Sequence, residues 1–318
     1  MSDPGSTPLV RVPRLQSLGG ALTAGERVVA EETAVAFTYN GTTHAVMMAT
    51  PADLEDFALG FSLSEAVIDT PDELVSLEVI RSNLGVELRM WIADVAVARY
   101  RARRRRLAGP VGCGLCGIES LEEAVRPAPV VTSDLTLSPS DISSAMASLP
   151  DLQWLNQEAR AVHAAAFWRP APGDAAGGNS LVALREDVGR HNALDKLAGA
   201  LAYSKVDASV GAVLLTSRVS VEMVQKTARL GAPVLIAISA PTALAVRTAE
   251  ACGVTLIAIA RGEHFEVFTH TDRIGAAQAA SCTELARAVK LISIASRTVI
   301  KTTDDESTVN ARSIEFQC

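Results

Sequence analysis

The 318-residue sequence has few aromatic residues, only 4% of the chain, and its net charge of −7 shows no excess of basic residues. No apolar run reaches the roughly 18 residues that a membrane-spanning helix needs, so we expect no membrane association. The mild acidity argues against a protein that binds nucleic acid with its whole surface. Residues Met1–Gly5 carry no basic segment followed by an apolar one, which predicts a cytoplasmic protein.

Cysteine is also scarce, because the chain has five in total and only Cys113 and Cys116 lie close together. The disulfide framework of a secreted protein is usually denser and even in number. In a reducing cytosol, this pair is therefore expected to do chemistry or to bind a metal rather than to form a structural bridge.

Several nucleotide and metal motifs are missing. The sequence contains no Gly-x-Gly-x-x-Gly and no Walker loop, which disfavours ordinary dinucleotide or ATP binding. There is no second Cys-x-x-Cys, although structural zinc normally takes four ligands. The single His-x-Glu, at His264–Glu266, follows the cysteines instead of preceding them as in zinc deaminases. We therefore expect no bound metal ion.

An apolar fraction of 48% excludes a mostly disordered chain, and the length indicates about two domains. Residues 1–22 and 301–318 lack periodicity and are predicted to be mobile tails. Residues 23–107 are expected to form an α+β domain, and residues 108–135 a linker that holds the cysteine pair. Residues 136–300 are predicted to form an α/β domain.

The first domain shows clear local signals. Strand patterns cover four segments, namely Glu26–Tyr39, Thr42–Met48, Leu74–Val79 and Val86–Ile92. Asn40-Gly41 is typical of a hairpin turn between the first two. Thr50 followed by Pro51 predicts the start of a helix, and apolar residues at helical spacing follow.

In the second domain, short apolar strands alternate with helices, which predicts a largely parallel sheet covered on both faces. The expected strands are Ala212–Thr216, Pro233–Ile238 and Val254–Ala260, and the expected helices are Val219–Leu230 and Thr242–Cys252. Ligands of such sheets bind beyond the carboxyl ends of the strands. Hydroxyls and arginines at residues 216–218, 239–242 and 261–263 suit an anionic ligand. Ordinary helix capping by Ser239 and Thr242 is the alternative.

The cysteine pair lies in a glycine-rich segment, Gly112–Gly117, after an arginine-rich stretch. That stretch contains Arg99, Arg101 and Arg103 to Arg106, and no acidic residue occurs between Val95 and Ile118. Nearby positive charge favours the thiolate and lowers the pKa of a cysteine, so reactive chemistry is the favoured interpretation. A solvated arginine run beside half a metal site, and a thioredoxin-type redox pair, are the alternatives.

Two further groups of polar residues are candidates. The segment Arg185–Asn192 leads into a helix and suits an anion or a heterocycle edge, or else a well-capped helix with surface charges. The segment Phe265–His270 alternates like a strand, with Phe265, Val267 and Thr269 on one face and Glu266, Phe268 and His270 on the other. An edge strand without a ligand is the plainer interpretation. His163, among small apolar residues, is expected to be a core histidine.

Together these residues resemble the FdhD family, the formate dehydrogenase accessory sulfurtransferases. The resemblance runs through Tyr39–Gly41, His44–Phe57, Gly112–Gly117, His163–Ala165, Glu186–Leu197 and Ser217 to about His270. It implies that Cys113 carries a persulfide received from a cysteine desulfurase and that Cys116 assists its transfer. It also implies that the second domain is similar to cytidine deaminases, without their zinc, and that the protein is a homodimer.

The resemblance further implies the cargo. The sulfur would pass to the molybdenum (or tungsten) bis(molybdopterin guanine dinucleotide) cofactor before its insertion into formate dehydrogenase. The cofactor-binding stretch of the family corresponds to Phe265, Glu266, Val267, Phe268, Thr269 and His270, and the parallel-sheet half would supply the platform for the guanine nucleotide and the pterin. A non-catalytic chaperone for this cofactor and a thioredoxin-like oxidoreductase remain competing interpretations.

Overall fold

The computed structural model describes residues 7–107, 128–170 and 181–275, with only the backbone for residues 102–107. The chain divides into two units, Met1–Gly275 and Ala276–Cys318, and all of the described residues belong to the first. Cys113, Cys116, the expected domain end at residue 300 and the expected tail at 301–318 lie outside the described residues.

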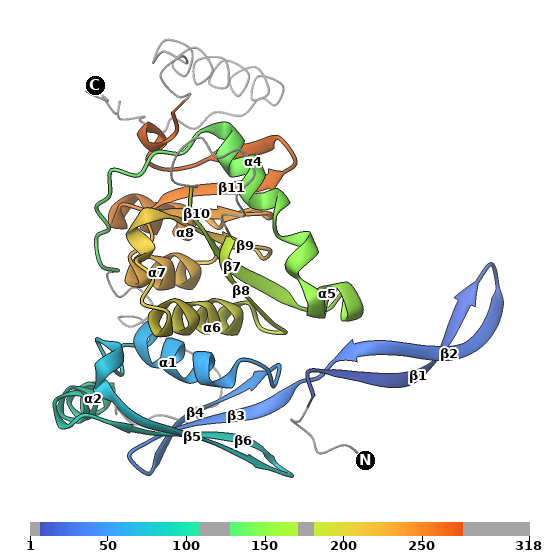
Figure 1. Ribbon diagram of the computed structural model, residues 1–318, viewed down its shortest axis with the longest axis horizontal. Coiled ribbons are helices and arrows are strands. Elements are labelled where there is room, and N and C mark those ends of the chain that lie inside the picture. The colour runs from blue at the N-terminus through green and yellow to red at the C-terminus, as the bar shows by residue number, and fades with distance from the viewer. Residues whose placement is uncertain (1–6, 108–127, 171–180, 276–318) are drawn as a thin grey trace, which may run out of the picture. The chain divides into compact units, whose positions relative to one another are not determined.

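A four-stranded sheet organises the N-terminal half, in the order β4-β3-β6-β5 (Figure 1). Its strands are β3 (Thr33–Tyr39), β4 (Thr42–Ala49), β5 (Leu74–Ser82) and β6 (Gly85–Ile92). β3 and β4 pair antiparallel through the turn at Asn40-Gly41, where both residues have positive φ angles of 47° and 78°. The predicted hairpin and the predicted β5–β6 pair are therefore confirmed.

Among its described residues, this half also contains the helices α1 (Leu54–Ser64) and α2 (Asp94–Leu107) and the 3-10 helix Pro71–Glu73. The core between the sheet and α1 contains Phe37, Phe57, Phe61, Leu88 and Met90. The Phe37 and Phe61 rings stack with centroids 4.1 Å apart. Burial of these large side chains supplies most of the hydrophobic stabilisation of the half.

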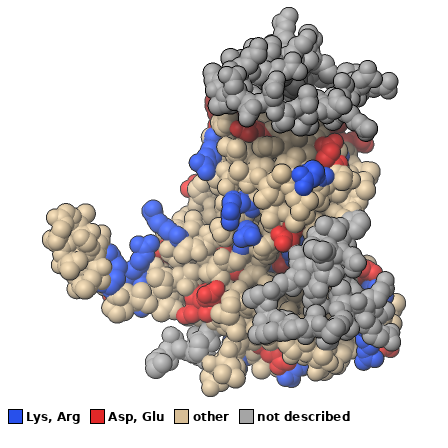
Figure 2. Space-filling model, turned by 180° about the vertical axis from the view of Figure 1, so that it is seen from behind, with Lys and Arg blue, Asp and Glu red and all other residues tan. Residues whose placement is uncertain are grey.

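The expected mobile tail at residues 1–22 is wrong where the structure describes it. Residues Leu9–Leu18 form β1, which pairs in register with β2 (Ala21–Ala30) around a turn at Gly19-Gly20. The hairpin projects from the sheets (Figure 1), and it contains the basic residues Arg11, Arg14 and Arg27. Blue side chains lie along its base in the space-filling view (Figure 2). Most of its residues are exposed. Because neither face packs on a core, its sequence lacks the alternation that identifies strands.

Two boundaries in this half also differ from the prediction. The strand expected over Glu26–Tyr39 is two strands, β2 and β3, because residues 31–32 separate a segment that pairs with β1 from one that pairs with β4 and β6. Helix α1 begins at Leu54 with Asp53 as its N-cap residue, instead of directly after Thr50. The Thr50 hydroxyl accepts a hydrogen bond from the Val188 backbone N–H at 3.1 Å, so it caps no helix.

The C-terminal half contains a six-stranded sheet in the order β12-β11-β10-β9-β7-β8. The strands are β7 (His163–Trp168), β8 (Leu181–Asp187), β9 (Ala212–Leu215), β10 (Val234–Ala237), β11 (Thr255–Arg261) and β12 (His264–Val267). The predicted strands β9, β10 and β11 are confirmed and are parallel to one another. The sheet as a whole is mixed rather than largely parallel, because β7, β8 and β12 add antiparallel pairings at its sides.

Helices cover both faces of this sheet. The larger elements are α4 (Pro139–Ala147), α5 (Trp154–Ala159), α6 (Arg190–Tyr203), α7 (Val221–Leu230) and α8 (Ala243–Cys252), and the 3-10 helices are Pro150–Leu152, Ala208–Val210 and Thr271–Arg273. One core lies between the sheet and helices α6, α7 and α8, and another lies on the α4 side (Figure 1). The expected α/β class, with an α+β half followed by a three-layer α/β half, is confirmed.

The two halves meet where α1 crosses α6, a contact made possible by two glycines. A Cβ atom at Gly60 would lie 1.7 Å from the Asp195 carbonyl oxygen, and one at Gly199 would lie 1.9 Å from the Asp56 carbonyl oxygen. The two helix backbones therefore touch directly, and only glycine fits at either position.

Membrane-spanning segments are not found among the helices that the structure describes, since none of them is both long and apolar enough to cross a bilayer.

Candidate functional site

Helix α2 carries the arginine-rich stretch that precedes the cysteines, and the fold gives part of that charge a partner. Arg99 forms ion pairs with Asp69 at 3.1 Å and with Glu73 at 2.6 Å. The hydrogen bond from Arg99 lowers the pKa of Glu73. The stretch has no acidic residue nearby in sequence, but tertiary folding brings acidic residues to its first turns.

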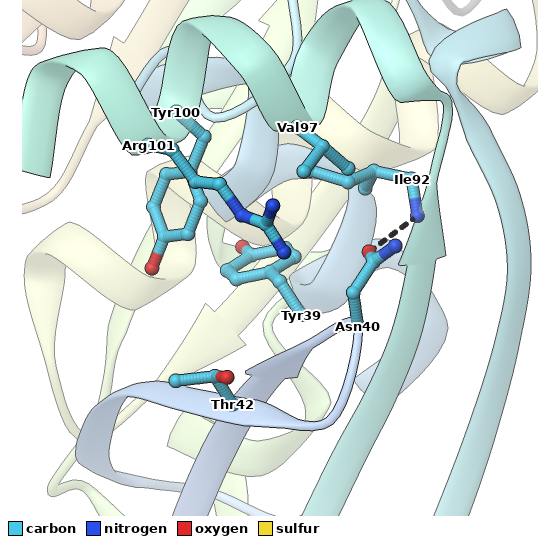
Figure 3. A pocket seen from close by; sticks show the side chains of 7 residues that line it. All are labelled: Tyr39, Asn40, Thr42, Ile92, Val97, Tyr100 and Arg101. Carbon is cyan, nitrogen blue, oxygen red and sulfur yellow. Dashed lines mark hydrogen bonds between the residues drawn. The ribbon is translucent and has the colours of Figure 1, made fainter.

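A cavity of about 340 Å³ opens beside the same helix. It is lined by Tyr39, Asn40, Thr42, Ile92, Val97, Tyr100 and Arg101 (Figure 3). The Asn40 side-chain oxygen accepts from the Ile92 backbone N–H at 3.0 Å, and the Tyr100 hydroxyl bonds His44 Nδ1 at 2.8 Å. Sequence reasoning did not find this cavity, because its lining comes from β3, β4, β6 and α2, which only the fold brings together.

The segment Arg185–Asn192 turns its acidic residues inward. Asp187 is fully buried, and its carboxylate pairs with Lys196 at 2.6 Å. It also accepts hydrogen bonds from the backbone N–H groups of Thr50 and Gly189 and from the Asn192 side-chain amide. These contacts join β8, α6 and the N-terminal half, so Asp187 and Asn192 have a structural role.

Glu186 and Arg185, two neighbours of Asp187, also have structural roles. Glu186 is buried and accepts from the backbone N–H groups of Leu155 and Asn156 at the start of α5. Arg185 donates from Nε to Asp56 at 2.7 Å, an ion pair between the two halves of the chain. The alternative of a well-capped helix with surface charges is therefore wrong for this part of the segment, because Glu186 and Asp187 are buried and no side chain caps α6.

Arg190 and His191, the first residues of α6, face a different environment. They join His163 at the start of β7, Arg218 after β9 and Glu222 in the first turn of α7, and we call these five residues the carboxyl-edge cluster. The Ala164 backbone N–H donates to Thr216 Oγ1 at 2.8 Å, which places His163 beside the carboxyl end of β9. His191 Nε2 lies 3.5 Å from Glu222 Oε2.

The electrostatics of the cluster disfavour charged histidine. Burial lowers the pKa of His163, and the charges of Arg190 and Arg218 lower it further. Burial also lowers the pKa of His191, with Arg190 adding to the effect and Glu222 opposing it. His163 is half-buried, so the expectation of a core histidine is wrong, since its first-in-strand position leaves it at the edge of the sheet.

At the carboxyl ends of β10 and β11, the sequence allowed either an anion-binding site or ordinary helix capping. Thr242 caps α8, because its hydroxyl accepts from the Ala245 backbone N–H at 3.2 Å. Arg261 is exposed and its Nε donates to the Ile238 carbonyl at 3.3 Å. Thr242 is therefore explained by helix capping, whereas the carboxyl-edge cluster has the charged residues expected of an anion-binding site.

The segment Phe265–His270 lies at the far side of the sheet. Phe265 and Val267 pack on the α4-side core, as alternation predicts, but β12 ends at Val267 and Phe268 packs against the other core. Thr269 is buried and bonds Val254 and Leu256, while His270 Nε2 bonds the Glu250 carbonyl at 3.1 Å. Residues 268–270 thus lie at the amino end of β11, opposite the carboxyl-edge cluster. Their role as cofactor ligands stays a prediction.

Several charged residues are buried that the sequence analysis did not identify. Lys196 lies in α6 and Lys226 in α7, and Lys226 bonds Asp195 of α6 at 2.8 Å and Glu65 at 3.0 Å. Lys196 Nζ also donates to the Thr50 carbonyl at 2.8 Å. The sequence feature that could have revealed them is a lysine on the apolar face of a predicted helix, because a buried lysine requires a partner of opposite charge.

The fold and these contacts define a two-part α/β protein in which an α+β half is fastened to a three-layer half by buried ion pairs. A sequence profile described as the FdhD/NarQ family matches residues 30–275. The chain belongs to the FdhD/NarQ family.

Curated relatives share about half of the sequence. The sulfur carrier protein FdhD of Agrobacterium fabrum is 54% identical over 265 residues, which are 83% of this chain and 95% of the relative. The protein of the same name from Brucella abortus is 53% identical over 249 residues, 78% of this chain and 90% of the relative.

A solved structure shares the fold. A protein from Desulfotalea psychrophila, assigned as a formate dehydrogenase accessory protein, superposes with a TM-score of 0.63 at 24% identity. The match covers 84% of this chain and 99% of that one. At this identity the likeness concerns the fold alone.

Proposed function

We propose that this protein is a sulfur carrier that serves formate dehydrogenase. The observation that carries the proposal is the sequence identity of about one half with relatives named sulfur carrier protein FdhD, over most of both chains. The Cys113-x-x-Cys116 pair within a glycine-rich segment supplies the chemistry that such a role needs.

The proposed loading step is an exchange at sulfur. The Cys113 thiolate attacks the outer sulfur of a persulfide on a cysteine desulfurase. A new S–S bond forms on Cys113, the donor's S–S bond breaks, and the donor cysteine leaves as a thiolate. The arginines that precede Cys113 in the sequence favour the thiolate that this step requires.

The proposed delivery step uses both cysteines. The Cys116 thiolate attacks the inner sulfur of the Cys113 persulfide, which forms a Cys113–Cys116 disulfide and releases the outer sulfur as hydrosulfide. The two cysteines are oxidised while the outer sulfur is reduced, so the electrons balance. A cellular dithiol then reduces the disulfide before the next cycle.

The acceptor in this proposal is the molybdenum bis(molybdopterin guanine dinucleotide) cofactor, which the protein holds as cargo. Phe265 to His270 are proposed to contact its guanine nucleotide. The protein is further proposed to act as a homodimer in the cytoplasm. Guanosine diphosphate is the probe for the nucleotide contact, and absence of measurable binding would remove that part of the proposal.

The test is persulfide mass spectrometry on the full chain. Incubation with a cysteine desulfurase and cysteine should add the mass of one sulfur atom to the wild type and to Cys252→Ala, and none to Cys113→Ala. Cys252 is a matched control, since it is buried and burial raises its pKa. Cys116→Ala should load sulfur but deliver it more slowly.

The competing functions predict other results. If Cys113→Ala still activates formate dehydrogenase fully, the protein is a cofactor chaperone and the carrier proposal fails. If the wild type cycles between dithiol and disulfide against a dithiol substrate without taking up sulfur, the protein is an oxidoreductase.

A further inference from the structure

The carboxyl-edge cluster has more hydrogen-bond donors than acceptors. The Nε atom of Arg190 and the Nε2 atom of His191 are buried and have no hydrogen-bond partner among the residues that the structure describes. Buried polar atoms are nearly always paired, so each unpaired one indicates a missing hydrogen-bond partner. The Glu222 carboxylate lies 3.5 Å from His191 Nε2, a distance typical of an ion pair rather than of a hydrogen bond.

The carboxylates around the cluster are already engaged. Glu222 Oε2 accepts from the Ser220 hydroxyl at 2.6 Å. Asp187, which faces His163 from β8, is held by Lys196 and by three further donors. Within residues 7–107, 128–170 and 181–275, no carboxylate forms an ion pair with Arg190 or Arg218. The part of the chain that the structure describes therefore offers no ion pair to balance the charge of either arginine.

The position of the cluster suits a ligand. His163, Arg190 and Arg218 lie where β9 ends and where α6 and α7 begin, and the carboxyl ends of parallel strands are the usual ligand side of such sheets. Arg218 is exposed, so the cluster is open to solvent on that side. Guanidinium groups match the oxygen geometry of phosphate, and His163 and His191 supply further donors when protonated.

We propose that the carboxyl-edge cluster binds a phosphate or diphosphate group, with Arg190 and Arg218 holding its oxygens and His163 and His191 beside them. This site is separate from residues 268–270, which lie at the amino end of β11. The inference goes beyond the proposed function, because anion binding requires no sulfur on Cys113. The source of the phosphate is either a free phosphate compound or the phosphates of a guanine nucleotide.

The first experiment is calorimetric titration of the full chain with inorganic pyrophosphate at low salt. Wild type should bind, and Arg218→Gln should bind at least about tenfold more weakly, because it loses a charge-assisted contact. Arg190→Gln should do the same, but its buried Nε atom makes misfolding a separate risk, so thermal unfolding is measured alongside. Arg247→Gln, an exposed arginine of α8, is the matched control and should bind like wild type.

The second readout is the titration of the imidazoles by NMR with and without pyrophosphate. The charged groups that face His163 are Arg190, Arg218 and Asp187, and those that face His191 are Arg190, Glu222 and Lys226. A bound anion adds negative charge beside them, so both pKa values should rise. The histidines outside the cluster, which are His44, His264 and His270, should not change and serve as internal controls.

A third arm distinguishes the two sources. If Arg218→Gln weakens both pyrophosphate and guanosine diphosphate, the cluster holds the phosphates of a nucleotide. If it weakens pyrophosphate alone, the cluster takes a free phosphate compound, and the nucleotide binds elsewhere. The proposal is overturned if wild type does not bind pyrophosphate, if Arg218→Gln and Arg247→Gln bind equally well, or if the His163 and His191 pKa values do not move. None of these outcomes depends on persulfide formation.

Discussion

At the scale of single residues, the pairing of Lys196 with Asp187 shows how this protein uses buried charge. Both side chains are fully buried, and the lysine also donates to the Thr50 carbonyl while Asp187 accepts from the Thr50 N–H. Removing two charges from water is costly unless every lone pair and proton finds a partner. Here the partners come from both halves, so the pair specifies how the halves fit together.

Lys196→Met should lower the free energy of unfolding by about 3–5 kcal/mol, because it leaves the Asp187 carboxylate buried without a counter-charge. Urea denaturation measures the change. Lys205→Gln, just after α6 and exposed, is the control and should change stability by less than about 0.5 kcal/mol. Equal midpoints for the two variants would contradict the structural role of the pair.

The two histidines of the carboxyl-edge cluster predict a loss of stability in mild acid. Both folded pKa values lie below the ordinary 6.5, so the unfolded chain takes up protons in this window while the folded chain does not. This contribution to stability is therefore complete above pH 6.5 and is lost as the pH falls toward the folded pKa values.

Urea midpoints at about pH 7.5 and about pH 5.5 measure this effect. The His163→Gln/His191→Gln double variant should show a smaller difference between the two pH values than wild type. His264→Gln, at an exposed position, should behave like wild type. A double variant with an unchanged difference would contradict the assignment.

At the scale of elements, the crossing of α1 and α6 depends on the absence of side chains at Gly60 and Gly199. Neither helix can move away without opening the buried pairs around Thr50, Asp187 and Lys196. The crossing therefore tolerates no added methyl group.

Gly60→Ala should destabilise the protein by about 3 kcal/mol or more, since its Cβ would overlap the Asp195 carbonyl. Gly25→Ala in β2 is the control, because a Cβ there meets nothing within 4 Å and its φ is not positive. Thermal unfolding compares the two. A Gly60→Ala variant as stable as Gly25→Ala would show that the helices can separate.

Some helices, strands and turns could be predicted from local sequence alone. The turn at Asn40-Gly41, the cap at Thr242 and the strands β9 to β11 were predictable, because each depends on a few adjacent residues. The β1–β2 hairpin was not, since a ribbon exposed on both faces has no hydrophobic period. The position of β7 in the sheet was not predictable either, because its pairing with β9 joins segments distant in sequence, whereas β12 was expected as an edge strand and pairs with the adjacent β11.

At the scale of the whole molecule, the close α1–α6 contact and the shared ion pairs make the two halves one cooperative unit. Trp91 lies in β6 of the N-terminal half, and Trp168 lies in β7 of the C-terminal half. These two tryptophans report on different halves of the same chain.

We expect a single unfolding transition in urea, with coincident midpoints from far-UV circular dichroism and from tryptophan fluorescence. A Trp91→Phe variant keeps only Trp154 and Trp168 of the C-terminal half, and a Trp154→Phe/Trp168→Phe variant keeps only Trp91. The two variants separate the signals of the halves and should give the same midpoint within about 0.3 M. Two resolved transitions would show that the halves unfold independently. Among these variants, Gly60→Ala should weaken the contact between the halves most and so favour two separate transitions.

The sequence by itself determined the α/β class, the strands and caps whose signals are local, and the reactive character expected of Cys113 and Cys116. Only the tertiary structure decided that Asp187 and Asn192 fasten the two halves, whereas Arg190 and His191, their neighbours in the chain, face the carboxyl end of β9. The physical reason is that burial and pairing depend on residues far apart in sequence. One polar segment therefore divides into structural and candidate binding residues only when the chain has folded.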